Sequence, residues 1–175
     1  MEQNRDCKLC PLYKGVKSVC IPGRGSSKPK YLFVGEAPGA DEDEGNQPFI
    51  GRSGMLLVEQ IKKVQMGPAR LTNVVRCRPP ENRQPEPEEI KACRVYLKQE
   101  IEETKPKFII AVGGVALGFL GKVSGILNWS GRMVGMVGKI PLLAVMHPSY
   151  VMRSGYYDDF AKDFVSLKNV ADTIE

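Results

Sequence analysis

Four short apolar runs alternate with segments of helical spacing, and this alternation restricts the fold more than any other feature. Helices are predicted for residues 54–64, 87–104, 114–121 and 160–174 from apolar spacing and from a Pro-Glu-Glu start at residue 87. Strands that alternate with helices indicate a parallel sheet with helices on both faces. We therefore expect an α/β fold, a three-layer α/β/α sandwich around a mostly parallel four-stranded sheet. The predicted strands cover residues 31–35, 71–77, 107–113 and 140–145.

The length of 175 residues fits one domain, so we expect a single domain over residues 1–175. Residues 1–30 are rich in Cys, Gly, Pro and Lys and predict an irregular segment shaped by metal ligands. No apolar run approaches the roughly 20 residues that span a bilayer, and the N-terminus lacks the apolar core of a signal peptide. We expect a cytoplasmic monomer without membrane contact. Its formal net charge of +5 admits anionic partners such as nucleic acid.

Five cysteines are unusual for a cytosolic chain, in which disulfides rarely persist. Cys7 and Cys10 form a C-x2-C pair, Cys77 and Cys93 form a second, wider pair, and Cys20 is left over. Two spaced pairs indicate four thiolates that meet at one metal centre. Ligand type leaves zinc and an iron–sulfur cluster open, and buried cysteines that pack as small apolar groups are a third interpretation.

Polar residues follow three of the predicted strands. Glu36 lies in the loop after the first strand, Asn73 is interpreted as a strand-end amide of the second, and His147, the only histidine, follows the last. Ligands of open parallel sheets bind beyond the carboxyl ends of the strands, so we expect these three residues at one rim. The segment GGVALG, residues 113–118, does not fit a dinucleotide-binding motif, and we interpret it as close helix–strand packing.

The motifs GEAPGADED…QPFIGRSGMLL, TNVVRCRPPENR and HPSY, together with the cysteine pairs, resemble the iron–sulfur, family 4 uracil-DNA glycosylases. The resemblance extends from Cys7 to about Arg153. Family 5 enzymes lack the acid that stands here as Glu36, and no histidine-bearing insertion of the covalently trapping relatives follows Cys77. The resemblance implies a hydrolase that flips uracil out of single- or double-stranded DNA, cleaves its N-glycosidic bond and leaves an abasic site for base-excision repair.

The resemblance also implies roles for residues that would contact the base. Phe49 would stack on the flipped uracil, and Asn73 would hydrogen-bond the base edge, which cytosine presents with reversed donors and acceptors. Glu42 would lie near C5 of the base and exclude the methyl group of thymine by bulk. The other acids of this loop are expected to be solvated or structural: Asp41, Asp43 and Glu44.

Two further roles concern the cleavage step, in which the sugar becomes cationic and uracil leaves as an anion. His147 would donate a hydrogen bond to O2, and a neutral imidazole suffices for this. Glu36 and Asn82 are the candidates for holding the water. Ala37 stands where the best-studied family of the superfamily has an aspartate, so the identity of any general base stays open.

By the same resemblance, a [4Fe–4S] cluster is the expected cofactor, with zinc as the less favoured alternative. The cluster would be structural, because hydrolysis moves no electrons. Arg153 is the best candidate for a DNA phosphate contact, while Arg76 and three other basic residues near the ligands could equally be surface charges. Two other functions stay open, a non-catalytic cysteine-metal nucleic-acid-binding module and an electron carrier. The expected cluster ligands are Cys7, Cys10, Cys77 and Cys93.

Overall fold

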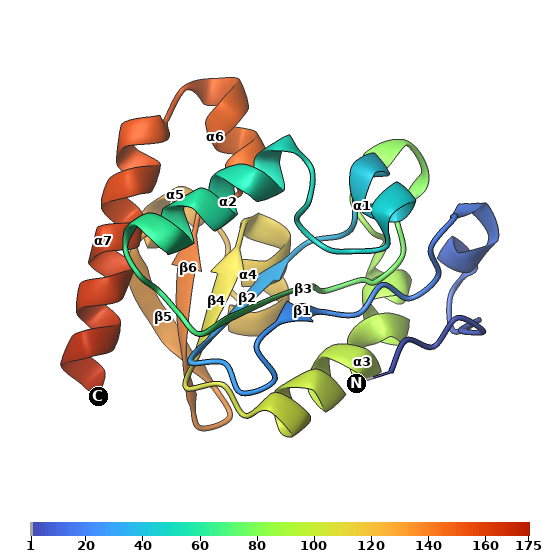
Figure 1. Cartoon of the computed structure of the whole chain (residues 1–175), viewed down its shortest axis with the longest axis horizontal. Helices are drawn as coiled ribbons and strands as arrows, with labels where there is room; N and C mark the ends of the chain where they lie inside the picture. The colour runs from blue at the N-terminus through green and yellow to red at the C-terminus, as the bar shows by residue number, and fades with distance from the viewer. Residues whose placement is uncertain (1) are drawn as a thin grey trace.

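The computed structural model describes residues 2–175 and centres on a six-stranded sheet in the order β1-β3-β2-β4-β6-β5 (Figure 1). The four middle strands run parallel, and β1 and β5 pair antiparallel at the two edges. The expected parallel four-stranded sheet is confirmed, and the edge strands extend it. The strands are β1 (Arg24–Gly25), β2 (Tyr31–Gly35), β3 (Ala69–Asn73), β4 (Phe108–Val112), β5 (Arg132–Val137) and β6 (Ile140–Val145).

Helices cover both faces of the sheet, as the alternating pattern predicts (Figure 1). All four predicted helices are present, and residues 87–104 form a helix with the expected bounds. Two short 3-10 helices, η1 (Pro11–Gly15) and η2 (Pro80–Asn82), lie in the cysteine-bearing segments. The α-helices are α1 (Ala40–Gly45), α2 (Arg52–Lys63), α3 (Pro87–Thr104), α4 (Gly114–Gly121), α5 (Ile126–Trp129), α6 (Pro148–Ser154) and α7 (Tyr157–Ile174).

The alternation of side chains along each strand divides the core into two layers. Phe33 and Ile110 point to one face and pack with residues of α2, α6 and α7. Leu32 and Ile109, their neighbours in the chain, point to the other face and pack with α3 and α4. All four side chains have 0% exposure, so the strands are buried on both faces, as in other three-layer α/β/α folds. Among residues 2–175, no helix has the length and apolar character needed to cross a membrane.

Two local predictions differ from the structure. The second strand ends at Asn73 and not at Cys77: Val74 and Val75 still donate to the Gly35 and Glu36 carbonyls, but the chain then turns Arg76 inward to Glu100. The acidic loop after β2 contains the short helix α1, whose start is stabilised by the Glu42 carboxylate accepting from the Gly39 N–H at 3.1 Å. A side chain that bonds its own backbone favours a helical turn even in a glycine-rich loop.

A buried carboxylate joins the sheet to α3. Glu100 is fully buried, and its carboxylate accepts from Arg70 Nε at 2.6 Å and from Arg76 at 2.7 Å. The hydroxyl of Thr72 donates to the same group at 2.7 Å. Two cations and one hydroxyl thus compensate the burial of this charge, which an isolated carboxylate could not sustain.

Replacing Glu100 by Gln should destabilise the fold by about 3 kcal/mol, because two buried guanidinium groups lose their counter-charge. Urea unfolding followed by circular dichroism measures the change. Glu102→Gln, on the exposed side of the same helix, is the matched control and should change stability by less than about 0.5 kcal/mol. Equal effects of the two substitutions would contradict a central role for the Glu100 cluster.

Candidate active site

A cavity of about 480 Å³ opens beyond the carboxyl ends of the parallel strands. Glu36 follows β2, Gly113 follows β4 and His147 follows β6, and all three line this cavity. The sheet therefore brings together residues that are more than 100 positions apart in the chain. Of the predicted site residues, those that line the cavity are Glu36, Glu42, Asn82, His147 and Arg153.

Phe49 and Asn73, the other two predicted base-contacting residues, meet one another over Gly35 at the end of β2. Phe49 Cζ and Asn73 Oδ1 lie 2.5 and 2.6 Å from the point where a Cβ atom of Gly35 would stand. Any larger residue at position 35 would displace both. Neither residue lines the cavity itself, and Phe49 is also part of the core cluster next to α2. Asn73 is 6% exposed, and within residues 2–175 no hydrogen bond joins its carboxamide to another group.

Two side chains, Arg24 and Glu42, hold the backbone around Phe49. Arg24 donates from Nε to the Pro48 carbonyl at 2.6 Å and from a terminal nitrogen to the Phe49 carbonyl at 2.9 Å. Glu42 accepts from the N–H groups of Ile50 and Gly51, which gives this carboxylate a structural role in the loop. Phe49 has a φ of 57°, a conformation that side-chain-bearing residues adopt only when their surroundings impose it.

His147 caps the start of α6, and its contacts select one tautomer. The Ser149 N–H donates to His147 Nδ1 at 3.2 Å, so Nδ1 carries the lone pair and Nε2 carries the hydrogen. The Ser149 hydroxyl lies 2.6 Å from the same nitrogen. Burial, and then the charge of Arg153, lowers the pKa of His147 to about 4, so the imidazole is neutral near pH 7. Gly113 packs against this ring: a Cβ there would stand 2.9 Å from His147 Cβ.

The remaining predicted residues lie around the mouth of the cavity. Burial raises the pKa of Glu36 above its ordinary value. Asn82 is exposed, and its Oδ1 accepts from Arg78 Nε at 2.8 Å. Arg153 is exposed at the end of α6 and therefore presents its charge to solvent beside His147.

All five cysteines line a second, separate chamber between the N-terminal segment, the chain after β3 and α3. The Cys20 N–H donates to Cys77 Sγ at 3.2 Å. Burial raises the pKa of Cys77 to about 11 and that of Cys93 to about 12, so both are protonated thiols in the absence of a cation. Among residues 2–175, no group of three or more His, Cys, Asp or Glu side chains is arranged to hold a single metal ion.

Arg76 shows that this chamber suits an anionic group. Its side chain is 2% exposed, lines the chamber, and leaves Nε without a hydrogen-bond partner. A buried donor without a partner is costly unless something accepts from it. Four thiols in two pairs could ligate a cluster as thiolates, and the buried guanidinium group of Arg76 would compensate its negative charge. The residues of the chamber therefore fit such a cluster. The interpretation of Arg76 as a phosphate-contacting residue is wrong, because the side chain is buried against Glu100.

Sequence reasoning missed three residues that shape the site. Arg24 acts through hydrogen bonds to Pro48 and Phe49, which are distant in the chain. Ser149 lies beside the histidine in the HPSY segment, but no spacing rule predicts its hydrogen bond to His147. The helix–strand packing expected of residues 113–118 is present at Ala116 and Leu117, whereas Gly113 itself lies against His147. Only its position at the end of a predicted strand could have indicated a role at the rim.

The sequence matches the family model of the uracil DNA glycosylase superfamily over residues 22–167. Three similar relatives are each named type-4 uracil-DNA glycosylase. The relative from Thermotoga maritima is 38% identical, over 87% of this chain and 81% of its own length. The relative from Pyrobaculum aerophilum is 40% identical, over 91% of this chain and 86% of its own length. The relative from Archaeoglobus fulgidus is 35% identical, over 89% of this chain and 85% of its own length. Together with the motifs gathered at the carboxyl ends of the strands, these matches show that the chain belongs to the type-4 family of the uracil-DNA glycosylase superfamily.

Proposed function

We propose that this chain is a monofunctional uracil-DNA glycosylase, which flips uracil out of DNA and hydrolyses its N-glycosidic bond. The observation that carries the proposal is the position of His147, a neutral hydrogen-bond donor, in the same cavity as Glu36 and Arg153. The names of the relatives support the same activity. Uracil-containing DNA is the substrate, and the abasic site is the product that base-excision repair consumes.

The proposed chemistry assigns His147 to the leaving group. Cleavage leaves negative charge on uracil O2, and a preorganised donor in a partly enclosed site stabilises that charge more than water does. Because Nδ1 accepts from the Ser149 N–H, Nε2 is the nitrogen that donates to O2. A neutral imidazole needs no proton from solvent to do this.

Glu36 and Asn82 are proposed to act on the sugar side. An ionised Glu36 would stabilise the developing sugar cation and hold the attacking water, and its raised pKa follows from the same burial that would strengthen this interaction. The Asn82 carboxamide, at the edge of the cavity, would supply a second contact to that water.

Phe49, Asn73 and Glu42 are proposed to select uracil. The Phe49 ring offers a face for stacking, worth about 1–3 kcal/mol per base. The Asn73 carboxamide keeps its donor and acceptor available for the base edge, because no protein group within residues 2–175 occupies them. Glu42, held by backbone N–H groups, would exclude the thymine methyl from a fixed position. Arg153 would contact a DNA phosphate beside the cavity.

The cysteine chamber is proposed to hold a [4Fe–4S] cluster. Two pairs of cysteines line it beside the buried guanidinium group of Arg76, and a bound zinc ion is the less favoured alternative. A bound cluster would supply a structural link between the N-terminal segment and the chain that follows Asn73. The ligands would be Cys7, Cys10, Cys77 and Cys93.

Release of uracil from an oligonucleotide tests the proposed function. The protein with its cluster should release uracil and leave thymine and cytosine in place, and Asn73→Ala should lower kcat/KM at least 100-fold while DNA binding is retained. Asn169→Ala, an exposed asparagine on α7, is the matched control and should leave the rate unchanged. A cluster-loaded protein that binds DNA and releases no uracil would instead be the non-catalytic binding module.

The single histidine gives a direct test of the proposed donor. Because burial lowers the pKa, the ¹⁵N NMR signals of His147 should show a neutral Nε2–H ring at pH 7 and titrate near pH 4, and near pH 6.5 in urea. As pH falls from about 6.5 toward 4, the unfolded chain binds a proton that the folded chain resists, so stability falls in this window. His147→Ala should slow uracil release about 100- to 1,000-fold. A folded-state midpoint near 6.5 would contradict the neutral donor.

Absorption and iron content test the cofactor. Purified protein should be brown, with broad absorption near 400 nm and about four iron atoms per chain. Cys77→Ser should lose most of the absorption and lower the melting temperature. Cys20→Ser should keep both, because Cys20 reaches Cys77 through its backbone N–H, which serine retains. A colourless protein with one bound zinc ion per chain would contradict the cluster assignment.

A further inference from the structure

A long open groove lies away from the candidate active site, between α3, α4 and the turn that joins β5 to β6. Its volume of about 1,110 Å³ is more than twice that of the cavity at His147. Pro106 and Lys139, near the starts of β4 and β6, line one end of it. The groove therefore reaches the amino ends of the parallel strands, whereas the candidate active site lies beyond their carboxyl ends.

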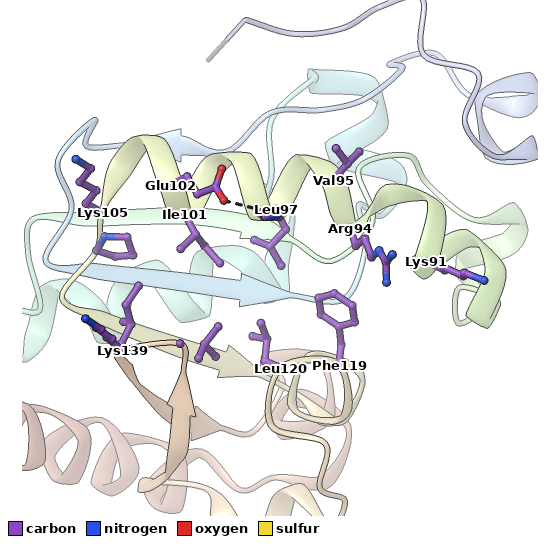
Figure 2. Close-up of a pocket in the computed structure, with 15 residues that line it drawn as sticks. Lys91, Arg94, Val95, Leu97, Ile101, Glu102, Lys105, Phe119, Leu120 and Lys139 are labelled. Carbon is purple, nitrogen blue, oxygen red and sulfur yellow. Dashed lines mark ion pairs between the residues drawn. The ribbon is translucent and has the colours of Figure 1, made fainter.

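The floor of the groove is apolar. Leu97 and Ile101 point from α3 toward Phe119 and Leu120 of α4, and aliphatic residues of the β5–β6 hairpin complete the surface (Figure 2). Leu97 is 2% exposed, whereas Ile101, Phe119 and Leu120 are only partly buried against the same core cluster. This surface belongs to the core layer under α3 and α4, yet part of it stays open to solvent.

The rim of the groove is strongly basic. Within the described part of the chain, residues 2–175, Glu102 is the one acidic residue that lines it, and it is paired with Lys98 at 3.9 Å (Figure 2). An apolar strip bordered by cations matches a ligand that is apolar on one side and anionic on both flanks. The basic residues of the rim are Lys91, Arg94, Lys98, Lys105 and Lys139.

The length of the groove sets the size of such a ligand. Lys91 and Lys105 both line it and are 14 residues apart along α3 and its C-cap, which is about 21 Å at 1.5 Å per residue. Four turns of a partner helix laid beside α3 would fill this length. An amphipathic helix with apolar residues at i, i+3, i+4 and i+7 presents a strip of matching shape.

We propose that this groove docks an acidic amphipathic helix of a partner protein. DNA fits less well, because phosphates make no use of an apolar floor of this length. A second copy of this chain also fits less well, because the formal net charge of +5 makes two copies repel one another. Docking at this groove leaves the cavity at His147 open to DNA, so a bound partner and the substrate would occupy the protein together.

Fluorescence anisotropy with a labelled 18-residue peptide tests the proposal. The peptide has leucine at i, i+3, i+4 and i+7 with the pattern continued over its four turns, glutamate on both flanks of this strip and alanine or glutamine on the remaining face, and it should bind the cluster-loaded protein saturably. The first control peptide has the same composition in scrambled order, and the second has serine in place of leucine. Both should bind at least tenfold more weakly, because they keep the charge and lose the apolar strip.

Matched protein variants separate the groove from general charge attraction. The double variant Lys98→Glu/Lys139→Glu changes both walls of the groove and should weaken peptide binding at least tenfold. Lys28→Glu/Lys62→Glu makes the same change in net charge at exposed positions outside the groove and should stay within twofold of the unaltered protein. Uracil release and melting temperature should be unchanged in both double variants, which shows that the fold is intact.

Four results would overturn the proposal. In the first two, the leucine peptide does not bind saturably, or the scrambled peptide binds as tightly as the leucine peptide. In the third, the two double variants weaken peptide binding equally. In the fourth, a 20-base-pair duplex without uracil displaces the peptide. The last result would assign the groove to nucleic acid. None of them depends on whether the chain releases uracil, so failure here is distinct from failure of the proposed function.

Discussion

The buried carboxylate of Glu100 is the interaction on which the position of both functional regions depends. It binds Arg70 and Thr72 in β3 and Arg76 just beyond the strand, and so it fixes this segment against α3. Asn73 lies between the anchored residues, and Cys77 follows directly after them. Arg76 also lines the cysteine chamber, so one charge cluster sets the asparagine at the rim and the thiols behind it. Removing Glu100 leaves two buried guanidinium groups without a counter-charge.

Close approach at the strand ends is the second requirement of the site. Gly35 lets the Phe49 ring and the Asn73 carboxamide meet above β2, and Gly113, with a φ of 92°, lets His147 lie against the end of β4. A Cβ atom at either position would push a site residue away by more than packing can absorb. The parallel sheet supplies the common rim, and these two glycines decide how near the functional side chains come to one another. The candidate site lies beyond the carboxyl ends of the strands, whereas the basic groove reaches their amino ends.

Much of the fold follows from local patterns. Apolar runs predict the parallel strands, and helical spacing predicts α2, α3, α4 and α7. The Pro-Glu-Glu sequence predicts the start of α3 at residue 87. Local patterns failed where a distant contact decides the outcome. Its sequence neighbours predict Arg76 to be an exposed cation near the cysteines. In the structure it is buried, because it forms an ion pair with Glu100, 24 residues later in the chain. The acidic loop contains α1 because Glu42 bonds the backbone around it, which composition does not reveal.

The sequence by itself determined the order of strands and helices, the residue types at the strand ends and the two cysteine pairs. These are local properties, because periodicity and turn chemistry act over a few residues. Only the tertiary structure decided that His147 is neutral with its hydrogen on Nε2, that Arg24 holds the backbone of Phe49, and that a basic groove lies behind the site. Those properties depend on burial and on contacts between segments far apart in the chain, and no short stretch of sequence contains them.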